Sequence, residues 1–343
     1  MSTADRRNPA PESLATTRRL IDPPMRAAVD RMPEPMRRIA GYHLGWVDEY
    51  GADTGDGGGK AVRPALTLLA ARSVGGDPAA AIVPAASIEL AHNYTLIHDD
   101  AMDGDRTRRH RPTAWSVFGR WQAILTGDAM LAQALNLLAT QQLSRAAQST
   151  QLLTSALLAL HQGQSTDLGL EHRTEVSLAE VTAMVYGKTG ALLACACEIG
   201  ALYGEGTPEQ VKSLRQFGEH LGMAFQLVDD ILGIWGDPAS TGKSVHSDLV
   251  ARKKSLPVTA ALVSGTAAGA ELADFYHGDG PLTTGELERA AELIVLAGGR
   301  DWARRQARHE FDQGVGHLME ATASEDHAAG LLDLARLIID RDH

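Results

Sequence analysis

The chain has 343 residues, 32 of them basic and 43 acidic, which gives a formal net charge of −11 at pH 7. Hydrophobic residues make up 44% of the sequence, which is too many for a disordered chain, and the acidic balance argues against a nucleic-acid partner. Two cysteines, Cys195 and Cys197, cannot staple a chain of this length, so a disulfide scaffold is excluded and a reducing, cytoplasmic setting is the simplest interpretation.

The first 21 residues are rich in Arg, Ser, Thr and Pro and lack the apolar stretch of a secretory signal. We expect residues 1–21 to form a disordered arm and residues 22–343 to form a single domain. Longer apolar runs further on, such as 190–204, are interrupted by Glu198 and fall short of the about 20 apolar residues that cross a membrane. No membrane span is predicted.

Beyond the arm, Ala, Leu, Arg, Gln and Glu dominate, and apolar residues recur every three or four positions, which predicts helices nearly throughout. The clearest helical patterns lie in residues 88–97, 128–139, 178–202 and 211–234. Loops rich in glycine, proline or charge separate them at 51–59, 106–112, 236–247 and 278–284. Wide, alanine-rich apolar faces predict one all-α bundle of about ten helices, several of them buried on more than one side.

Two acidic clusters each follow an apolar helix. In Asp99-Asp100-Ala101-Met102-Asp103, the first and last aspartates are one turn apart, so their carboxylates share a helix face and can approach one cation. The second cluster is Asp229-Asp230. A single acidic cluster is more often a solvated surface. However, adjacent carboxylates repel one another, and two such clusters favour a bound cation such as Mg²⁺, which prefers oxygen ligands and commonly bridges to phosphates.

Basic side chains gather near these clusters although the chain is acidic overall. They follow the first cluster, the second cluster and the glycine-rich loop in three groups: Arg108 and Arg109; Lys243, Lys253 and Lys254; Lys60 and Arg63. Arginine binds phosphate oxygens through paired hydrogen bonds and lysine acts as a point charge. The pattern predicts a polyanionic ligand held by metal and by cations. No Gly-Lys pair has the glycine spacing of a P-loop, so an ATPase is not predicted.

Taken together, the motifs resemble those of the trans-prenyltransferases, or polyprenyl synthetases, which make isoprenoid diphosphates. Any one segment is weak, whereas their joint order is specific. The similar segments are, in family order, Gly59-Lys60-Ala61-Val62-Arg63-Pro64, Asp99 to Asp103 with Arg108-Arg109, Gly163-Gln164 with Asp167, Lys188-Thr189, Gln226 to Asp230, Gly242-Lys243, Asp248, and Lys253-Lys254-Ser255-Leu256-Pro257.

The resemblance implies an all-α, isoprenoid-synthase-type bundle around a central cavity, usually a homodimer, that uses Mg²⁺ to join isopentenyl diphosphate to an allylic diphosphate. By position, it implies that the metal ligands are Asp99, Asp103 and Asp229, with Asp100 and Asp230 in support. It assigns the isopentenyl diphosphate site to Lys60, Arg63, His92 and Arg109. It places around the allylic diphosphate Arg108, Lys188, Thr189, Gln226, Lys243 and Lys253. The catalytic set is then Asp99, Asp100, Asp103, Asp229, Arg108 and Lys188.

Two positions bear on metal binding and product length. The family usually has a third aspartate where this chain has Gly233, so we infer that Asp229 alone contacts the metal directly and that the third carboxylate is dispensable or replaced through water. An aromatic residue five positions before the first motif, here Tyr94, resembles the short-chain synthases that stop at C20. Geranylgeranyl diphosphate is therefore the predicted product. Thr95 lies closer than Tyr94 to the helix face of Asp99. The alternative interpretation of Tyr94 is a packed core residue that does not set the product length.

Three alternatives stay open. A farnesyl or longer-chain diphosphate synthase differs only in product. A class I terpene cyclase shares the fold and first motif, but it would need an Asn/Asp, Ser, Glu metal triad after Asp229 and would not need the Lys60, Arg63 and His92 set. A non-catalytic helical subunit could regulate a partner synthase, although all five aspartates of the two motifs are present here.

Overall fold

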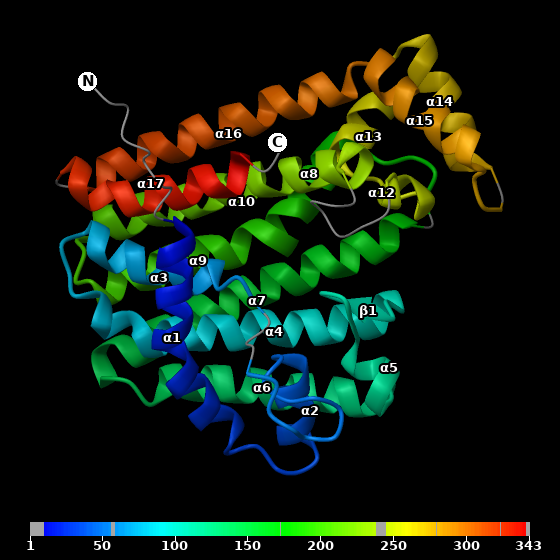
Figure 1. Cartoon of the computed structure of the whole chain (residues 1–343). Coiled ribbons are helices and arrows are strands. Elements are labelled where there is room, and N and C mark those ends of the chain that lie inside the picture. Colours follow the sequence, from blue (N-terminus) through cyan, green and yellow to red (C-terminus); the bar gives the residue numbers. More distant parts are fainter. Residues whose placement is uncertain are drawn as a thin grey trace, which may run out of the picture. The chain divides into compact units, whose positions relative to one another are not determined.

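A computed structural model of the protein describes residues 10–55, 59–171, 173–237, 245–278, 280–322 and 324–340 (Figure 1). Helices make up most of this part of the chain, which confirms the predicted all-α class. In chain order the elements are α1 (Ala10–Val29), α2 (Met36–His43), α3 (Val62–Ser73), η1 (Pro78–Ala81), α4 (Ile82–Asp103), β1 (Thr107–Arg108), β2 (Arg111–Pro112), α5 (Ala114–Phe118), α6 (Arg120–Ala139), α7 (Leu143–Glu171), α8 (Leu178–Val185), η2 (Tyr186–Gly190), α9 (Ala191–Tyr203), α10 (Pro208–Trp235), α12 (Ser247–Val250), α13 (Leu256–Leu262), α14 (Ala267–His277), α15 (Thr284–Leu296), α16 (Gly299–Ala321) and α17 (Glu325–Ile339).

The predicted disordered arm is wrong for residues 10–21, because α1 begins at Ala10. Residues 1–9 lie outside the described part of the chain. The buried side chains Thr17, Ile21, Met25 and Ala28 recur every three or four residues and form one face of the helix. That apolar stripe stabilises the helix despite its polar composition, because the arginines lie on the remaining faces.

The chain divides into two compact units. The first unit contains residues 1–154, 195–215 and 319–334, and the second contains residues 155–194, 216–318 and 335–343. The single domain over 22–343 stays a prediction. The first acidic cluster belongs to the first unit and the second cluster to the second unit.

In the first unit, α4 packs along α6 and also contacts α1 and α3 (Figure 1). Its side chains Ile88, Leu90 and Ile97 are fully buried, as expected for a helix that is apolar on several sides. The helix ends at Asp103, and Gly104 follows with a φ of 74°, a left-handed conformation that commonly terminates helices. The first acidic cluster is thus the last turn of a helix anchored in the core.

In the second unit, glycines allow helices to approach closely beside the site. A Cβ on Gly163 of α7 would lie 2.5 Å from the backbone nitrogen of Lys188, and one on Gly222 of α10 would lie 2.6 Å from the Cα of Gly190. Both contacts involve η2, a π-helical turn between α8 and α9. Single π-helical turns are frequent at functional sites, and η2 contains the predicted residues Lys188 and Thr189.

One helical stretch, residues 178–203, is long and apolar enough to cross a membrane by composition. However, 78% of its most apolar window is buried inside the structure. Such burial is usual for the core helix of a soluble protein, because neighbouring helices rather than lipid cover its apolar faces.

Candidate active site

In the first unit, Arg63 of α3 lies against His92 of α4. Arg63 Nη1 donates to His92 Nε2 over 3.0 Å. Because a guanidinium only donates, this contact requires a lone pair on Nε2, so the imidazole is neutral. Burial and the nearby Arg63 and Arg109 hold the pKa of His92 well below its usual value. The two predicted residues therefore form one cationic pair, with its charge on the arginine.

A short hairpin carries the next arginine. Strands β1 and β2 pair Arg108 with Arg111, and the two residues between them, Arg109 and His110, have φ values of 51° and 61°. Positive φ at both central positions is typical of the type I′ turn, where glycine or asparagine is usual, so Arg109 and His110 are held in a conformation that is costly for their side chains. Arg111 fixes the hairpin by donating to the carbonyl oxygen of Val47 over 3.1 Å.

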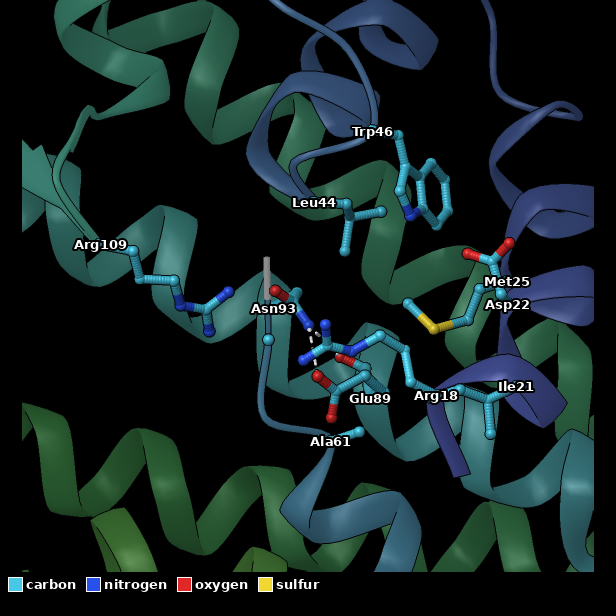
Figure 2. A pocket seen from close by; sticks show the side chains of 11 residues that line it. Arg18, Ile21, Asp22, Met25, Leu44, Trp46, Ala61, Glu89, Asn93 and Arg109 are labelled. Carbon is cyan, nitrogen blue, oxygen red and sulfur yellow. Dashed lines mark hydrogen bonds between the residues drawn. The ribbon is translucent and has the colours of Figure 1, made fainter. Parts of the chain in front are cut away.

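Arg109 lines a pocket of the first unit. Figure 2 shows Arg18 and Arg109 entering this pocket from opposite sides, with Glu89 and Asn93 between them. Asn93 Nδ2 donates to Glu89 Oε1 over 3.2 Å, whereas the buried Oε2 atom has no hydrogen-bond partner among the described residues. Burial raises the pKa of Glu89, and the positive charges of Arg63, Arg109 and Arg18 oppose that rise. The pocket is thus lined by two arginines, Arg18 and Arg109, and by two carboxylates, those of Asp22 and of the buried Glu89.

The first acidic cluster places its aspartates in different surroundings. Asp100 is buried and accepts a hydrogen bond from Arg108 Nε over 2.7 Å, and burial raises its pKa while Arg108 opposes this. Asp99 is half-buried and Asp103 is exposed. Asp100, the predicted supporting aspartate, is therefore directed into the protein interior. The predicted metal ligands Asp99 and Asp103 are more accessible to solvent.

In the second unit, hydrogen bonds join the predicted residues into two neighbouring sets. Lys188 Nζ donates to Asp167 Oδ2 over 2.6 Å, and Thr189 Oγ1 donates to Gln226 Oε1 over 2.8 Å. Gln226 Nε2 in turn donates to Asp230 Oδ1 over 2.8 Å. The first set connects η2 with α7 and the second connects η2 with α10, and all five residues line one pocket.

Asp230 and Asp229 have different roles in this arrangement. Asp230 is buried and accepts hydrogen bonds on both oxygens, the second from the backbone nitrogen of Leu256 over 2.9 Å. Burial raises its pKa to about 6. Asp229 is half-buried. As in the first cluster, one aspartate of the pair anchors the protein and its neighbour is the more accessible to a cation.

Lys253 lies among four carboxylates. Partial burial alone would lower the pKa of Lys253. The negative charges of the four carboxylates raise this pKa above its usual value, so the ammonium group stays charged; they belong to Asp230, Asp248, Asp167 and Asp229. Lys254, its neighbour, donates instead to the carbonyl oxygen of Leu170 over 2.7 Å. Of this lysine pair, Lys253 is the one that lines the pocket.

The residues of both acidic motifs fit Mg²⁺ by the chemistry of their donors. Asp99, Asp103 and Asp229 provide hard carboxylate oxygens. Asp230 accepts hydrogen bonds within the protein on both oxygens, and Asp100 accepts one from Arg108 on Oδ1. Within the described residues, no three His, Cys, Asp or Glu side chains are gathered into a complete metal site. Mg²⁺ is usually bound by one or two carboxylates, with water and substrate phosphates completing its shell.

Most predicted site residues fall into these two groups. Lys60 is exposed on the segment before α3, and Lys243 lies in residues 238–244, outside the described part of the chain. Sequence analysis missed Arg18, Glu89 and Asn93. Glu89 lies about one helical turn before His92 on α4, and Asn93 directly follows His92. A search for polar residues near His92 in the sequence would therefore have found both. Arg18 had no such signal, since it was assigned to the arm.

The predicted chain-length residues Tyr94 and Thr95 are both buried on α4. The Tyr94 ring packs edge-to-face against His98, with 4.8 Å between ring centroids. His98 in turn fits over Gly127 of α6, where a Cβ would lie 2.3 Å from its ring. Tyr94 is therefore part of a packed aromatic contact close to the first acidic cluster.

Comparison with known proteins agrees with these observations. A sequence model of the family described as polyprenyl synthetase matches residues 45–294. The chain is 44% identical to the (2E,6E)-farnesyl diphosphate synthase of Mycobacterium tuberculosis, over 97% of this chain and 96% of the relative. It is 42% identical to the geranylgeranyl diphosphate synthase of the same organism, over 93% of this chain and 91% of the relative.

Solved structures give the same result. The polyprenyl synthetase from Streptomyces coelicolor A3(2) matches with a TM-score of 0.90 and 43% identity, over 96% of this chain and 99% of that chain. The geranylgeranyl pyrophosphate synthetase from Pyrococcus horikoshii matches with a TM-score of 0.86 and 30% identity, over 96% and 98% of the two chains. The chain therefore belongs to the polyprenyl synthetase family and is a prenyltransferase.

Proposed function

We propose that the protein catalyses the Mg²⁺-dependent, head-to-tail condensation of isopentenyl diphosphate with an allylic diphosphate, and that its main product is geranylgeranyl diphosphate. The observation that carries the proposal is the presence of two separate groups of basic side chains, one in each unit. One contains Arg63 and Arg109 in the first unit, and the other contains Lys188 and Lys253 in the second. A condensation binds two diphosphates, whereas a terpene cyclase binds one.

The chemistry follows from charge. The allylic carbon–oxygen bond breaks with its electron pair leaving on the diphosphate, and an allylic cation remains. Mg²⁺ bound by Asp99, Asp103 and Asp229 would oppose the charge that develops on the leaving group. Lys188 and Lys253 act in the same direction, because each is already held in place by aspartates and needs little reorganisation.

The second substrate is held by the first unit. Arg63, Arg109 and Lys60 bind the diphosphate of isopentenyl diphosphate, and the neutral His92 orients Arg63 through their 3.0 Å contact. The double bond of this substrate attacks the allylic cation and forms the new carbon–carbon bond. A proton then leaves to the departing diphosphate, and the product is five carbons longer.

Product length is the finer part of the proposal. Tyr94, buried one and a half turns before Asp99 and packed on His98, supports a short cavity and hence a C20 product. Farnesyl diphosphate is the second candidate, since a relative with that name is 44% identical over nearly the whole chain. We also propose a cytoplasmic homodimer, as the family resemblance implies.

The test is an incubation of the purified protein with isopentenyl diphosphate, Mg²⁺ and each of three starters, dimethylallyl, geranyl and farnesyl diphosphate. Product length is measured by mass spectrometry after dephosphorylation. A C20 product supports the proposal and a C15 product supports the farnesyl alternative. Absence of elongation with every starter contradicts the proposal, and release of a hydrocarbon favours a cyclase.

Two controls define the metal requirement. Addition of EDTA should abolish elongation, and excess Mg²⁺ should restore it. Asp229→Asn should lower kcat by at least about 10²-fold, the cost typical of removing one group that stabilises developing charge. The matched control is Asp312→Asn, an exposed position on α16 that changes the net charge equally. Full activity in Asp229→Asn would exclude Asp229 as a metal ligand.

A further inference from the structure

The β1–β2 hairpin turns at Arg109 and His110, which both have positive φ values, 51° and 61°. Residues with a Cβ rarely adopt this left-handed conformation, and it persists only where surrounding contacts hold the backbone in place. Rotation about φ reorients the Cα–Cβ bond relative to the strand. The contacts that fix the hairpin therefore also decide where the Arg109 side chain reaches.

The hairpin is attached to a different helix on each side of its turn. On the first strand, Arg108 Nε donates to Asp100 Oδ1 of α4 over 2.7 Å. On the second strand, Arg111 Nη2 donates to the carbonyl oxygen of Val47 over 3.1 Å, and Nη1 lies 3.5 Å from that of Tyr42 in α2. Arg111 thus joins β2 to α2 and to the segment that follows α2.

The Tyr42 side chain completes this attachment. The guanidinium of Arg111 lies over its ring, with Cζ 4.5 Å from the ring centroid, as in a cation–π contact. The Tyr42 hydroxyl donates to the carbonyl oxygen of Pro112 over 2.8 Å. Tyr42 is buried, and its ring packs edge-to-face on Phe118 with 5.2 Å between centroids. We call this pair of side chains the Tyr42–Arg111 clamp.

The clamp lies outside the pocket that Arg109 enters. Arg109 lines the pocket that contains Glu89, whereas neither Tyr42 nor Arg111 is among the described residues that line it. The clamp therefore acts on a ligand of this pocket through the turn that it holds. Arg108 does not depend on the clamp in the same way, because its own bond to Asp100 fixes it to α4.

We infer that Tyr42 and Arg111 are positioning residues, which hold the turn at Arg109 and His110 so that the Arg109 guanidinium reaches the diphosphate of isopentenyl diphosphate. The inference rests on the proposed function, in which Arg109 binds this substrate. Without the clamp, the turn residues relax toward negative φ and the Arg109 side chain leaves its place in the pocket. The binding of one substrate then weakens, and the binding of the allylic starter does not.

The test measures steady-state elongation by the whole protein at saturating MgCl₂, with isopentenyl diphosphate and the allylic starter varied in turn. Arg111→Lys keeps the positive charge but loses the planar fork that bonds two carbonyl groups and stacks on Tyr42. We expect it to raise KM for isopentenyl diphosphate by about 10- to 100-fold, the loss that corresponds to one hydrogen bond between charged groups. KM for the allylic starter should stay the same. The matched control is Arg120→Lys, because Arg120 is an exposed arginine over the Trp115 ring and lies outside the clamp.

A second variant tests the other half of the clamp. Tyr42→Phe keeps the ring that packs on Phe118 and removes only the hydroxyl that bonds Pro112. It should raise the same KM by about 3- to 10-fold, the loss that corresponds to one neutral hydrogen bond. Circular dichroism and melting temperature establish that each variant is folded before its kinetics are compared.

Rescue at the turn separates positioning from general stability. Glycine adopts positive φ without the cost that a Cβ imposes, so His110→Gly reduces the need for the clamp. Combined with Arg111→Lys, it should return KM for isopentenyl diphosphate most of the way to the unmodified value. His110→Gly alone should leave this KM unchanged, because the clamp already holds the turn.

Four results overturn the inference. They are unchanged KM for isopentenyl diphosphate in Arg111→Lys and Tyr42→Phe, an equal rise in KM for both substrates, an equal rise in Arg120→Lys, and absence of rescue by His110→Gly. The last three would make the clamp a source of stability or charge without a positioning role. If the unmodified protein elongates no starter, the proposed function itself fails, whereas normal elongation with any of these four results removes the inference alone.

Discussion

Replacement of Gly163 by alanine should disturb the pocket that contains Lys188 and Lys253 without removing a charged group. Gly163 is buried on α7, and its added Cβ would lie 2.5 Å from the backbone nitrogen of Lys188 and 2.9 Å from the carbonyl oxygen of Met184. Contacts closer than 3.4 Å are already tight, so α7 and η2 must separate by about 0.9 Å. These neighbours are backbone atoms of a helix and cannot rotate away.

The expected cost has two parts. Overpacking of this kind costs about 1–3 kcal/mol of stability, which corresponds to a loss of several degrees in melting temperature for a protein of this size. The displacement also moves Lys188 and Thr189 relative to Asp167 and Gln226, to which they are bonded over 2.6 and 2.8 Å. A misplacement near 1 Å can cost about 10²-fold in rate, so kcat should fall by roughly 10- to 100-fold.

Gly169→Ala is the matched control, because Gly169 is an exposed residue of the same helix and a Cβ there meets nothing within 4 Å. Alanine is the better helix former, so this variant should be equally or more stable by up to about 1 kcal/mol, with unchanged activity. Melting temperature by calorimetry and steady-state rates with a fixed starter give both readouts. Equal stability and rates in Gly163→Ala and Gly169→Ala would refute the close-packing argument.

Three further outcomes are expected. Tyr94→Ala removes a buried ring beside His98, so products longer than C20 should appear in the mass spectrum; an unchanged distribution would count against Tyr94 as the end of the cavity. Arg18→Gln removes a cation from the pocket around Glu89, so it should raise KM for isopentenyl diphosphate severalfold and leave KM for the allylic starter the same. The control is Arg19→Gln, because Arg19 is an exposed neighbour that is bonded to Thr16. Equal kinetics in the two variants would exclude Arg18 from the site. Burial and Arg109 lower the pKa of His43 from 6.5 to about 3, so the folded state excludes a proton that the unfolded chain binds. Stability is therefore lost as pH falls below 6.5, by about 1–2 kcal/mol at pH 5. Urea unfolding at pH 7 and pH 5 should therefore show a smaller difference for His43→Gln, and an identical difference would show that His43 is protonated in the folded protein.

The helical class and the face shared by Asp99 and Asp103 could be predicted from the sequence, because both depend on the 3.6-residue period of a helix. The structure confirms that α4 runs through Asp103. The same periodicity was present in Thr17, Ile21, Met25 and Ala28, but the polar composition of the segment concealed it. The spacing of apolar residues therefore predicted helices correctly, whereas the polar composition of residues 10–21 led to a wrong prediction.

Tertiary packing decided which member of each aspartate pair faces the protein. Asp100 of α4 pairs with Arg108 of strand β1, and Asp230 accepts from the backbone of Leu256, 26 residues further along the chain. The approach of Arg18 to Glu89 and of Asp248 to Gly233 also joins separate helices. A helical period relates residues only three or four positions apart, so contacts over longer separations depend on how the helices pack and on where glycine lets them come close.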